Sequence, residues 1–153
     1  MDKRELKIDY FIYRDSYPEG YAGLCKKALE ASEKAYCVYS DFAVGAAVLL
    51  ADGTIVTGNN QENAAFPSGL CAERTALFYA GANYPQVPVK ALAVVAGYKG
   101  QIREKYVTPC GACRQVMSEV IKRYGKDFEV ILIGQKENLV IKASALLPLA
   151  FDF

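Results

Sequence analysis

The sequence of 153 residues has no histidine, no long apolar segment and no long block of charge of one sign. Without histidine, imidazole is excluded as a metal ligand. A membrane span would need an apolar run of roughly 18 residues, and no apolar signal core follows the charged start, so we expect a cytoplasmic protein with no membrane partner. The 18 basic and 17 acidic residues are mixed along the chain. This argues against a nucleic-acid partner, because phosphate backbones usually require a basic stripe.

The composition, with 52% hydrophobic residues, predicts one domain with a sizeable core. We expect residues 17–153 to form this single domain and residues 1–16 to form an appended N-terminal arm. In the arm, Ile8, Tyr10 and Ile12 alternate with polar or mixed neighbours. This alternation favours an added edge strand or a cover over a subunit interface.

The apolar pattern predicts three helices and five strands around one sheet, which is an α/β fold. The first helix should cover about 18–35 and the second about 71–82, and the third should start with Thr108 as N-cap and Pro109 as first helical residue and end at Gly125. Strands are expected over 44–50, 54–59, 91–96, 129–133 and 138–141. Asp52-Gly53 marks a hairpin between the first two strands, and 97–107 should form a surface loop.

Three of the five cysteines occur in two short motifs, Cys71-Ala72-Glu73 and Cys110-Gly111-Ala112-Cys113. Zinc bound to this chain must be held by sulfur, which makes Cys71, Cys110 and Cys113 the candidate ligands. Three protein ligands leave a fourth position for water, as in catalytic zinc sites. Both motifs fall at predicted helix starts, where the helix dipole lowers thiol pKa values. If both helices cover the same face of the sheet, the motifs converge.

Glu73 lies two residues after Cys71, a spacing that puts the two side chains on different sides of a helix. It is therefore a poor candidate for a metal ligand and a good one for the catalytic group that carries protons. Three thiolates around Zn²⁺ give a net charge of −1, which a cation should compensate. Arg74 and Arg114, which directly follow Glu73 and Cys113, could donate hydrogen bonds to the thiolates.

Two other interpretations of the cysteines remain. A Cys-x-x-Cys pair alone could be a redox pair or half of a structural zinc site. A structural site would need a fourth ligand, and only Cys25 or Cys37 could complete four sulfurs. Neither has a partner at close ligand spacing, and Cys25 falls on the apolar stripe of the first helix, which predicts a core position.

The sequence resembles the small cytidine deaminases of the homotetrameric, three-cysteine zinc type, from about Tyr17 to Phe151. The blocks that carry the resemblance are the two cysteine motifs with their following Arg74 and Arg114-Gln115, and the segments 39–47, 58–64 and 146–148. The resemblance implies a three-layer αβα cytidine deaminase-like fold with one mixed five-stranded sheet.

The resemblance also implies substrate-binding residues. Asn60 and Glu62 match the pair that holds the ribose hydroxyls, Phe42 matches an aromatic beside the nucleoside, Ala72 would offer its backbone N–H to the base carbonyl, and Phe151 matches an aromatic from a neighbouring subunit. Simpler roles exist for most of them. Phe42 could be core, Asn60 and Glu62 could close a turn, and Phe151 could pack at the C-terminus.

The function implied is zinc-dependent hydrolytic deamination of cytidine and 2′-deoxycytidine in pyrimidine salvage, with one Zn²⁺ per subunit of a homotetramer whose subunits share active sites. The chain departs from the family pattern at three places. The aromatic residue that usually follows Glu-Asn-Ala comes one position later, at Phe66, because Ala65 intervenes. Leu149 stands where a small residue is usual, and the N-terminal arm is extra. Deamination of a cytosine antibiotic such as blasticidin S is the closest rival function. A polynucleotide deaminase fits less well because the chain lacks histidine, and a zinc-stabilised binding module would show no turnover.

Overall fold

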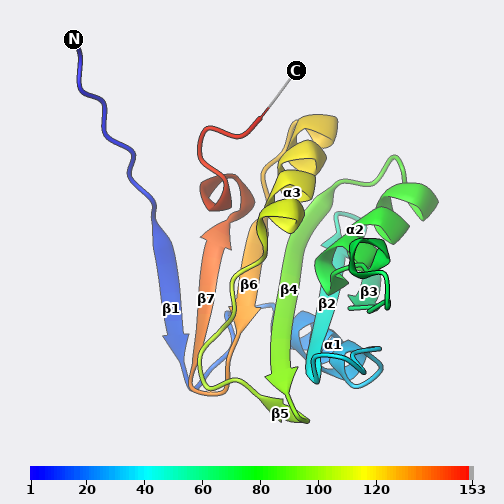
Figure 1. Ribbon diagram of the computed structural model, residues 1–153. Helices are drawn as coiled ribbons and strands as arrows, with labels where there is room; N and C mark the ends of the chain where they lie inside the picture. Colours follow the sequence, from blue (N-terminus) through cyan, green and yellow to red (C-terminus); the bar gives the residue numbers. More distant parts are fainter. Residues whose placement is uncertain (152–153) are drawn as a thin grey trace.

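A computed structural model describes residues 1–151, which form one mixed seven-stranded sheet with helices on both faces (Figure 1). The last two residues of the expected domain, 17–153, lie outside the described part. The strand order is β1-β7-β6-β4-β2-β3, with the short β5 paired to β4. The strands are β1 (Tyr10–Arg14), β2 (Phe42–Leu50), β3 (Ile55–Asn59), β4 (Val89–Tyr98), β5 (Gln101–Ile102), β6 (Glu129–Ile133) and β7 (Glu137–Lys142).

The helices divide between the two faces of the sheet. In Figure 1, α2 (Ala72–Asn83) and α3 (Gly111–Tyr124) lie in front of the sheet and α1 (Ala22–Ser32) lies behind it. One core cluster joins residues of α2 and α3 to the sheet, and a second joins residues of α1 to the opposite face. The described chain also contains two short 3₁₀ helices, η1 (Phe66–Ser68) and η2 (Ala143–Leu146). The αβα layers and the shared face of α2 and α3 therefore agree with the expectation.

Strand β4 lies at the centre of the sheet, parallel to β6 and antiparallel to β2. Every residue from 91 to 97 is buried, which explains the uninterrupted apolar run in the sequence: a strand covered by helices on both faces has no solvent side to keep polar.

Cys25 is fully buried in α1, as its position on the apolar stripe indicates. Within residues 1–151, no helix is both long and apolar enough to cross a membrane.

The expected count of five strands is wrong, because two further strands complete the sheet. One is β5, a two-residue strand that pairs with β4 inside the segment expected to be a loop. The other is β1, contributed by the arm, which runs antiparallel to β7 from Tyr10 opposite Ile141 to Arg14 opposite Glu137. The alternation in the arm therefore does reflect an edge strand.

Strand β1 makes modest contacts with the core. Ile12 packs against the cluster on the α2/α3 face and Tyr13 against the cluster on the α1 face. Phe11 remains 67% exposed. The buried Asn138 of β7 fixes the end of the arm, because its Nδ2 donates to the carbonyl of Ser16 at 2.8 Å.

Helix α3 starts later than expected. Thr108 is not its N-cap and Pro109 is not its first residue; Cys110 occupies the N-cap in an extended conformation, and Gly111 begins the helix. The C-terminus agrees with the sequence, since Gly125 ends α3 in the left-handed conformation (φ 61°) that glycine favours.

Gly58 in β3 allows α2 to lie directly against the sheet. A Cβ atom at this position would lie 2.5 Å from the backbone N of Ala76 and 2.8 Å from the carbonyl O of Ala72. Both distances are shorter than real Cβ contacts, and the opposing atoms belong to helix backbone. The absence of a side chain at Gly58 therefore determines how closely the N-terminal part of α2 approaches the sheet.

Candidate active site

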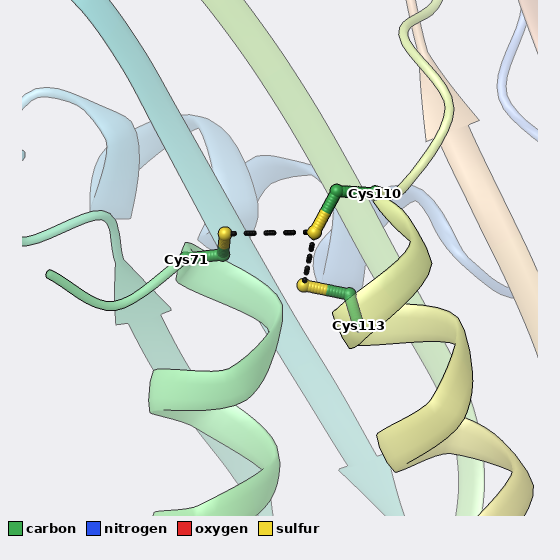
Figure 2. Close-up of side chains that lie close together, drawn as sticks. All are labelled: Cys71, Cys110 and Cys113. Atoms are coloured by element: carbon green, nitrogen blue, oxygen red, sulfur yellow. Dashed lines mark hydrogen bonds between the residues drawn. The ribbon is translucent and has the colours of Figure 1, made fainter. Parts of the chain in front are cut away.

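The three predicted ligand cysteines meet at the N-termini of α2 and α3 (Figure 2). Cys71 is the N-cap of α2, Cys110 is the N-cap of α3, and Cys113 lies in the first turn of α3. The Sγ atoms of Cys71 and Cys110 are 3.8 Å apart, those of Cys110 and Cys113 are 3.5 Å apart, and all three lie within 4.8 Å of one another. Helices on one face of the sheet thus bring together ligands that are distant in sequence.

This arrangement fits a zinc ion. With Zn–S bonds of 2.3 Å and tetrahedral angles, adjacent sulfurs are separated by about 3.8 Å. The separations from Cys110 to Cys71, 3.8 Å, and to Cys113, 3.5 Å, are close to this value. Among the described residues, the cluster contains three cysteines only. Neither Cys25 nor Cys37 belongs to it, so the fourth sulfur that a structural site would require is not supplied by them.

The surroundings favour a thiolate at Cys71. The pKa of Cys71 is lowered to about 5, chiefly by the hydrogen bond from the Cys113 thiol and further by the Arg74 guanidinium. The pKa of Cys113 is raised, because its thiol donates this bond and because it is fully buried. Cys71 therefore releases its proton more readily than Cys113 does. A cation at the centre of the three sulfurs would replace the thiol protons.

The two arginines beside the motifs differ in their contacts. Nη2 of Arg74 donates to Sγ of Cys71 at 3.5 Å, as proposed from the sequence, and this bond raises the pKa of Arg74. In contrast, Arg114 donates through Nε to the carbonyl of Pro109 at 2.8 Å and through Nη1 to that of Leu146 at 2.9 Å. The observed bonds of Arg114 thus connect the segment before Cys110 to η2, and they go to backbone carbonyls, not to sulfur.

Glu73 is buried next to the sulfur cluster. Its side chain is 5% exposed, and burial raises the pKa of its carboxyl group above the usual range. A raised pKa suits a group that must accept and return protons near neutral pH. Ala72, fully buried, is the first residue of α2. Its backbone N–H is one of those that have no acceptor within the helix.

Asn60 follows β3 and binds the backbone of β2 with both ends of its amide. Its Oδ1 accepts from the N–H of Val44 at 2.8 Å, and its Nδ2 donates to the carbonyl of Phe42 at 2.9 Å. Phe42, half-buried, begins β2. The amide retains one N–H and one lone pair for a further partner.

Glu62 accepts hydrogen bonds from the turn that precedes β2. Its Oε2 accepts from the backbone N–H groups of Tyr39, at 2.8 Å, and Ser40, at 3.3 Å, and its Oε1 accepts from the Ser40 hydroxyl. These bonds, led by that of the Ser40 hydroxyl, lower the pKa of Glu62. The carboxylate is therefore ionised and oriented at neutral pH.

A short backbone ladder connects this segment to the Cys71 motif. Gln61 pairs with Leu70 through two hydrogen bonds of 2.9 Å, one in each direction. On the other side, the backbone of Tyr36 bonds to Asn60 and Glu62 at 3.0 and 2.8 Å. Leu70 directly precedes Cys71, so the predicted sugar-binding residues lie beside the start of α2.

Phe151 lies at the end of the described chain and its side chain is 68% exposed. Its carbonyl accepts from Nε2 of Gln115 at 3.2 Å, which ties the C-terminal segment to α3.

Sequence reasoning did not identify Ser40 as a partner of Glu62. The available signal was weak: serine and aspartate in the Ser40-Asp41 pair favour turns, and Asp41 does adopt a positive φ of 54°.

Comparison with known proteins agrees with the geometry. Residues 19–124 match the family described as the cytidine and deoxycytidylate deaminase zinc-binding region. The curated cytidine deaminase of Halalkalibacterium halodurans is 45% identical over 128 residues, which cover 84% of this chain and 91% of the relative.

Solved structures give the same result. The cytidine deaminase of Burkholderia pseudomallei superimposes with a TM-score of 0.72 and 43% identity, covering 84% of this chain and 97% of the other. The cytidine deaminase of Mycobacterium tuberculosis superimposes with a TM-score of 0.70 and 34% identity, covering 89% of this chain and all of the other (100%).

Proposed function

Because the chain belongs to the cytidine and deoxycytidylate deaminase family, we propose that it is a zinc-dependent hydrolase that deaminates cytidine and 2′-deoxycytidine. In this reaction water replaces the amino group on C4 of the cytosine ring, and the products are uridine or 2′-deoxyuridine and ammonia. One observation carries the proposal: three sulfurs converge at two helix N-termini beside a buried carboxylate.

Cys71, Cys110 and Cys113 would hold one Zn²⁺ per subunit, since their separations suit tetrahedral sulfur ligation. Bound zinc would supply Lewis acidity and lower the pKa of a water in the open position toward neutrality. Arg74 would moderate the negative charge of the thiolates through its bond to Cys71. Arg114 would act indirectly, by holding the carbonyl of Pro109 just before Cys110.

Glu73 would be the catalytic proton carrier. It would take a proton from the attacking water and deliver it to N3 of the ring, and it would pass a second proton to the amino group before ammonia leaves. Its burial supports this role, because the carboxyl group is shielded from bulk water. The backbone N–H of Ala72 would bind the carbonyl of the base.

The sugar would be held by Asn60 and Glu62, whose free lone pairs and remaining N–H can pair with hydroxyls that both donate and accept. Phe42 would lie beside the nucleoside. Phe151 would reach the site of a neighbouring subunit in a homotetramer, and its exposed position on a segment held by Gln115 is compatible with this role. We further propose a cytoplasmic location and a role in pyrimidine salvage.

The test is product formation by the purified, zinc-loaded protein on parallel samples of cytidine, 2′-deoxycytidine, cytidine monophosphate and blasticidin S, followed by chromatography. Conversion of the two nucleosides alone is expected. Conversion of only the antibiotic would preserve the chemistry and reject the substrate. Zinc bound with no turnover on any of the four would reject the enzyme and favour a structural metal.

A further inference from the structure

Ser40 links two of the proposed substrate-binding residues through a single hydroxyl. Its Oγ accepts from the backbone N–H of Phe42 at 3.0 Å and donates to Oε1 of Glu62. A serine hydroxyl has one hydrogen and can accept through its lone pairs. Because the Phe42 N–H occupies the acceptor side, the single O–H is directed at the carboxylate.

The turn that carries Ser40 is closed by its own backbone and does not depend on Glu62 alone. The N–H of Asp41 donates to the carbonyl of Cys37 at 2.9 Å, and Asp41 holds a positive φ of 54°. The turn thereby directs the N–H groups of Tyr39 and Ser40 to Oε2 of Glu62. The Ser40 hydroxyl is the donor observed at Oε1 among the described residues.

We propose that Ser40 is a positioning residue that orients the Glu62 carboxylate toward the sugar hydroxyls, an inference that rests on the proposed function. The terminal torsion of a glutamate is broad and roughly two-fold, so the backbone bonds to Oε2 leave the plane of the carboxylate adjustable. The bond to Oε1 fixes this plane. Ser40 itself need not touch the nucleoside.

The lowered pKa of Glu62 agrees with this role, since the largest cause of the shift is the Ser40 hydroxyl and the next is the N–H of Tyr39. Loss of the hydroxyl should move the pKa of Glu62 back toward the ordinary glutamate value of 4.5. The acid side of the kcat/KM profile for cytidine should then move to higher pH.

The chain offers a matched control in a second serine–carboxylate pair, Ser144 and Asp127, which lies beyond the C-terminal end of α3. Asp127 accepts from the backbone N–H groups of Phe128 and Ser144 and from the Ser144 hydroxyl at 2.6 Å, which is the same set of donors that Glu62 has. Like Ser40, Ser144 is exposed. Ser144→Ala therefore removes an equivalent serine–carboxylate bond without altering the proposed site.

The experiment compares Ser40→Ala, Ser40→Thr and Ser144→Ala on cytidine and on 2′,3′-dideoxycytidine, which lacks the 2′- and 3′-hydroxyls of the sugar. Ser40→Ala should lower kcat/KM for cytidine roughly tenfold, the usual effect of losing a hydrogen bond to a charged group, and should change that for the dideoxy substrate less than twofold. Ser40→Thr should restore most of the activity, and Ser144→Ala should match the wild type. Equal losses on both substrates would overturn the proposal, because the effect would not pass through the sugar hydroxyls.

A second measurement does not depend on turnover. The pKa of the Glu62 carboxyl group can be followed by carbon NMR in the wild type and in Ser40→Ala. A rise in Ser40→Ala supports the link between the two residues, and an unchanged pKa rejects it. If the wild type fails to deaminate cytidine while the pKa of Glu62 still depends on Ser40, the proposed function is wrong but the pairing of Ser40 and Glu62 stands.

Discussion

The proposed metal-binding half of the site and its proposed sugar-binding half are built differently. The three sulfurs are placed by the starts of two helices packed on a sheet, with Cys113 fully buried. Asn60 and Glu62 are placed by hydrogen bonds between side chains and backbone in partly exposed segments. The first half depends on the core as a whole, whereas the second depends on individual bonds. Changes in the first should therefore abolish function, and changes in the second should weaken it by degrees.

The largest effect should come from removing a buried ligand. Cys113→Ala should lose nearly all bound zinc and reduce deamination to background, because two sulfurs cannot form the site. Metal content by mass spectrometry and product formation check this. Cys25→Ala is the control: it also removes a fully buried thiol, but outside the cluster, and should retain one zinc per chain. Full zinc content in Cys113→Ala would remove this residue from the ligand set.

The second-largest effect should come from changing Glu73, which separates metal binding from proton transfer within the proposed metal-binding half. Glu73→Gln should retain zinc and lower kcat by roughly 10²- to 10⁴-fold, the usual contribution of a general acid–base group. Steady-state kinetics together with metal analysis test it. Glu119→Gln, on an exposed part of α3, should leave both quantities unchanged. Wild-type turnover in Glu73→Gln would refute its assignment as proton carrier.

Glu62→Gln tests whether the sugar-binding half responds by degrees. We expect a rise in KM for cytidine of roughly tenfold, typical of a hydrogen bond to a charged group, with a smaller change in kcat.

The wild-type pKa of Glu62 lies below the ordinary 4.5, so the carboxylate binds a proton only as the pH falls below that value. KM for cytidine in the wild type should therefore stay constant down to about pH 4.5 and rise below it. A pH-independent KM across this range would argue against the role of the carboxylate.

The smallest effect on catalysis is expected from the arm, which lies outside both halves of the site. Deleting residues 2–14 removes β1 and the half-buried contacts of Ile12 and Tyr13, a loss of about 2 kcal/mol in the free energy of unfolding. Denaturant unfolding should show this loss, with kcat changed less than twofold. Retention of the proposed homotetramer after the deletion would argue against a role of the arm at a subunit interface.

Much of the core architecture could be predicted because local signals and packing agree. The run in β4, the hairpin at Asp52-Gly53 and the glycine that ends α3 each have one dominant physical cause. The start of α3 could not be predicted from local signals. Thr108 and Pro109 look like a cap and a first helical residue, yet Pro109 is buried, Arg114 holds its carbonyl, and Cys110 becomes the N-cap. Contacts distant in sequence set this boundary.

In the candidate site, the meeting of the three cysteines could be predicted because their residue types and spacing are chemically restrictive. The bond from Arg74 to Cys71 could be predicted from adjacency, but adjacency misled for Arg114, whose guanidinium donates to backbone carbonyls. The link between Ser40 and Glu62 spans 22 positions and depends on a turn conformation that residue types only weakly indicate. The two-residue strand β5 is likewise too short to have a sequence period.

Gly58 has a consequence for the genetics of this protein. Every missense change at its codon introduces a Cβ atom, and the two nearest atoms that this Cβ would meet belong to the backbone of α2, the helix whose N-cap is Cys71. In a library of random substitutions selected for loss of deaminase activity, codon 58 should therefore yield inactive alleles of almost every kind. Their products would carry an unaltered set of the residues proposed to bind zinc and to transfer protons.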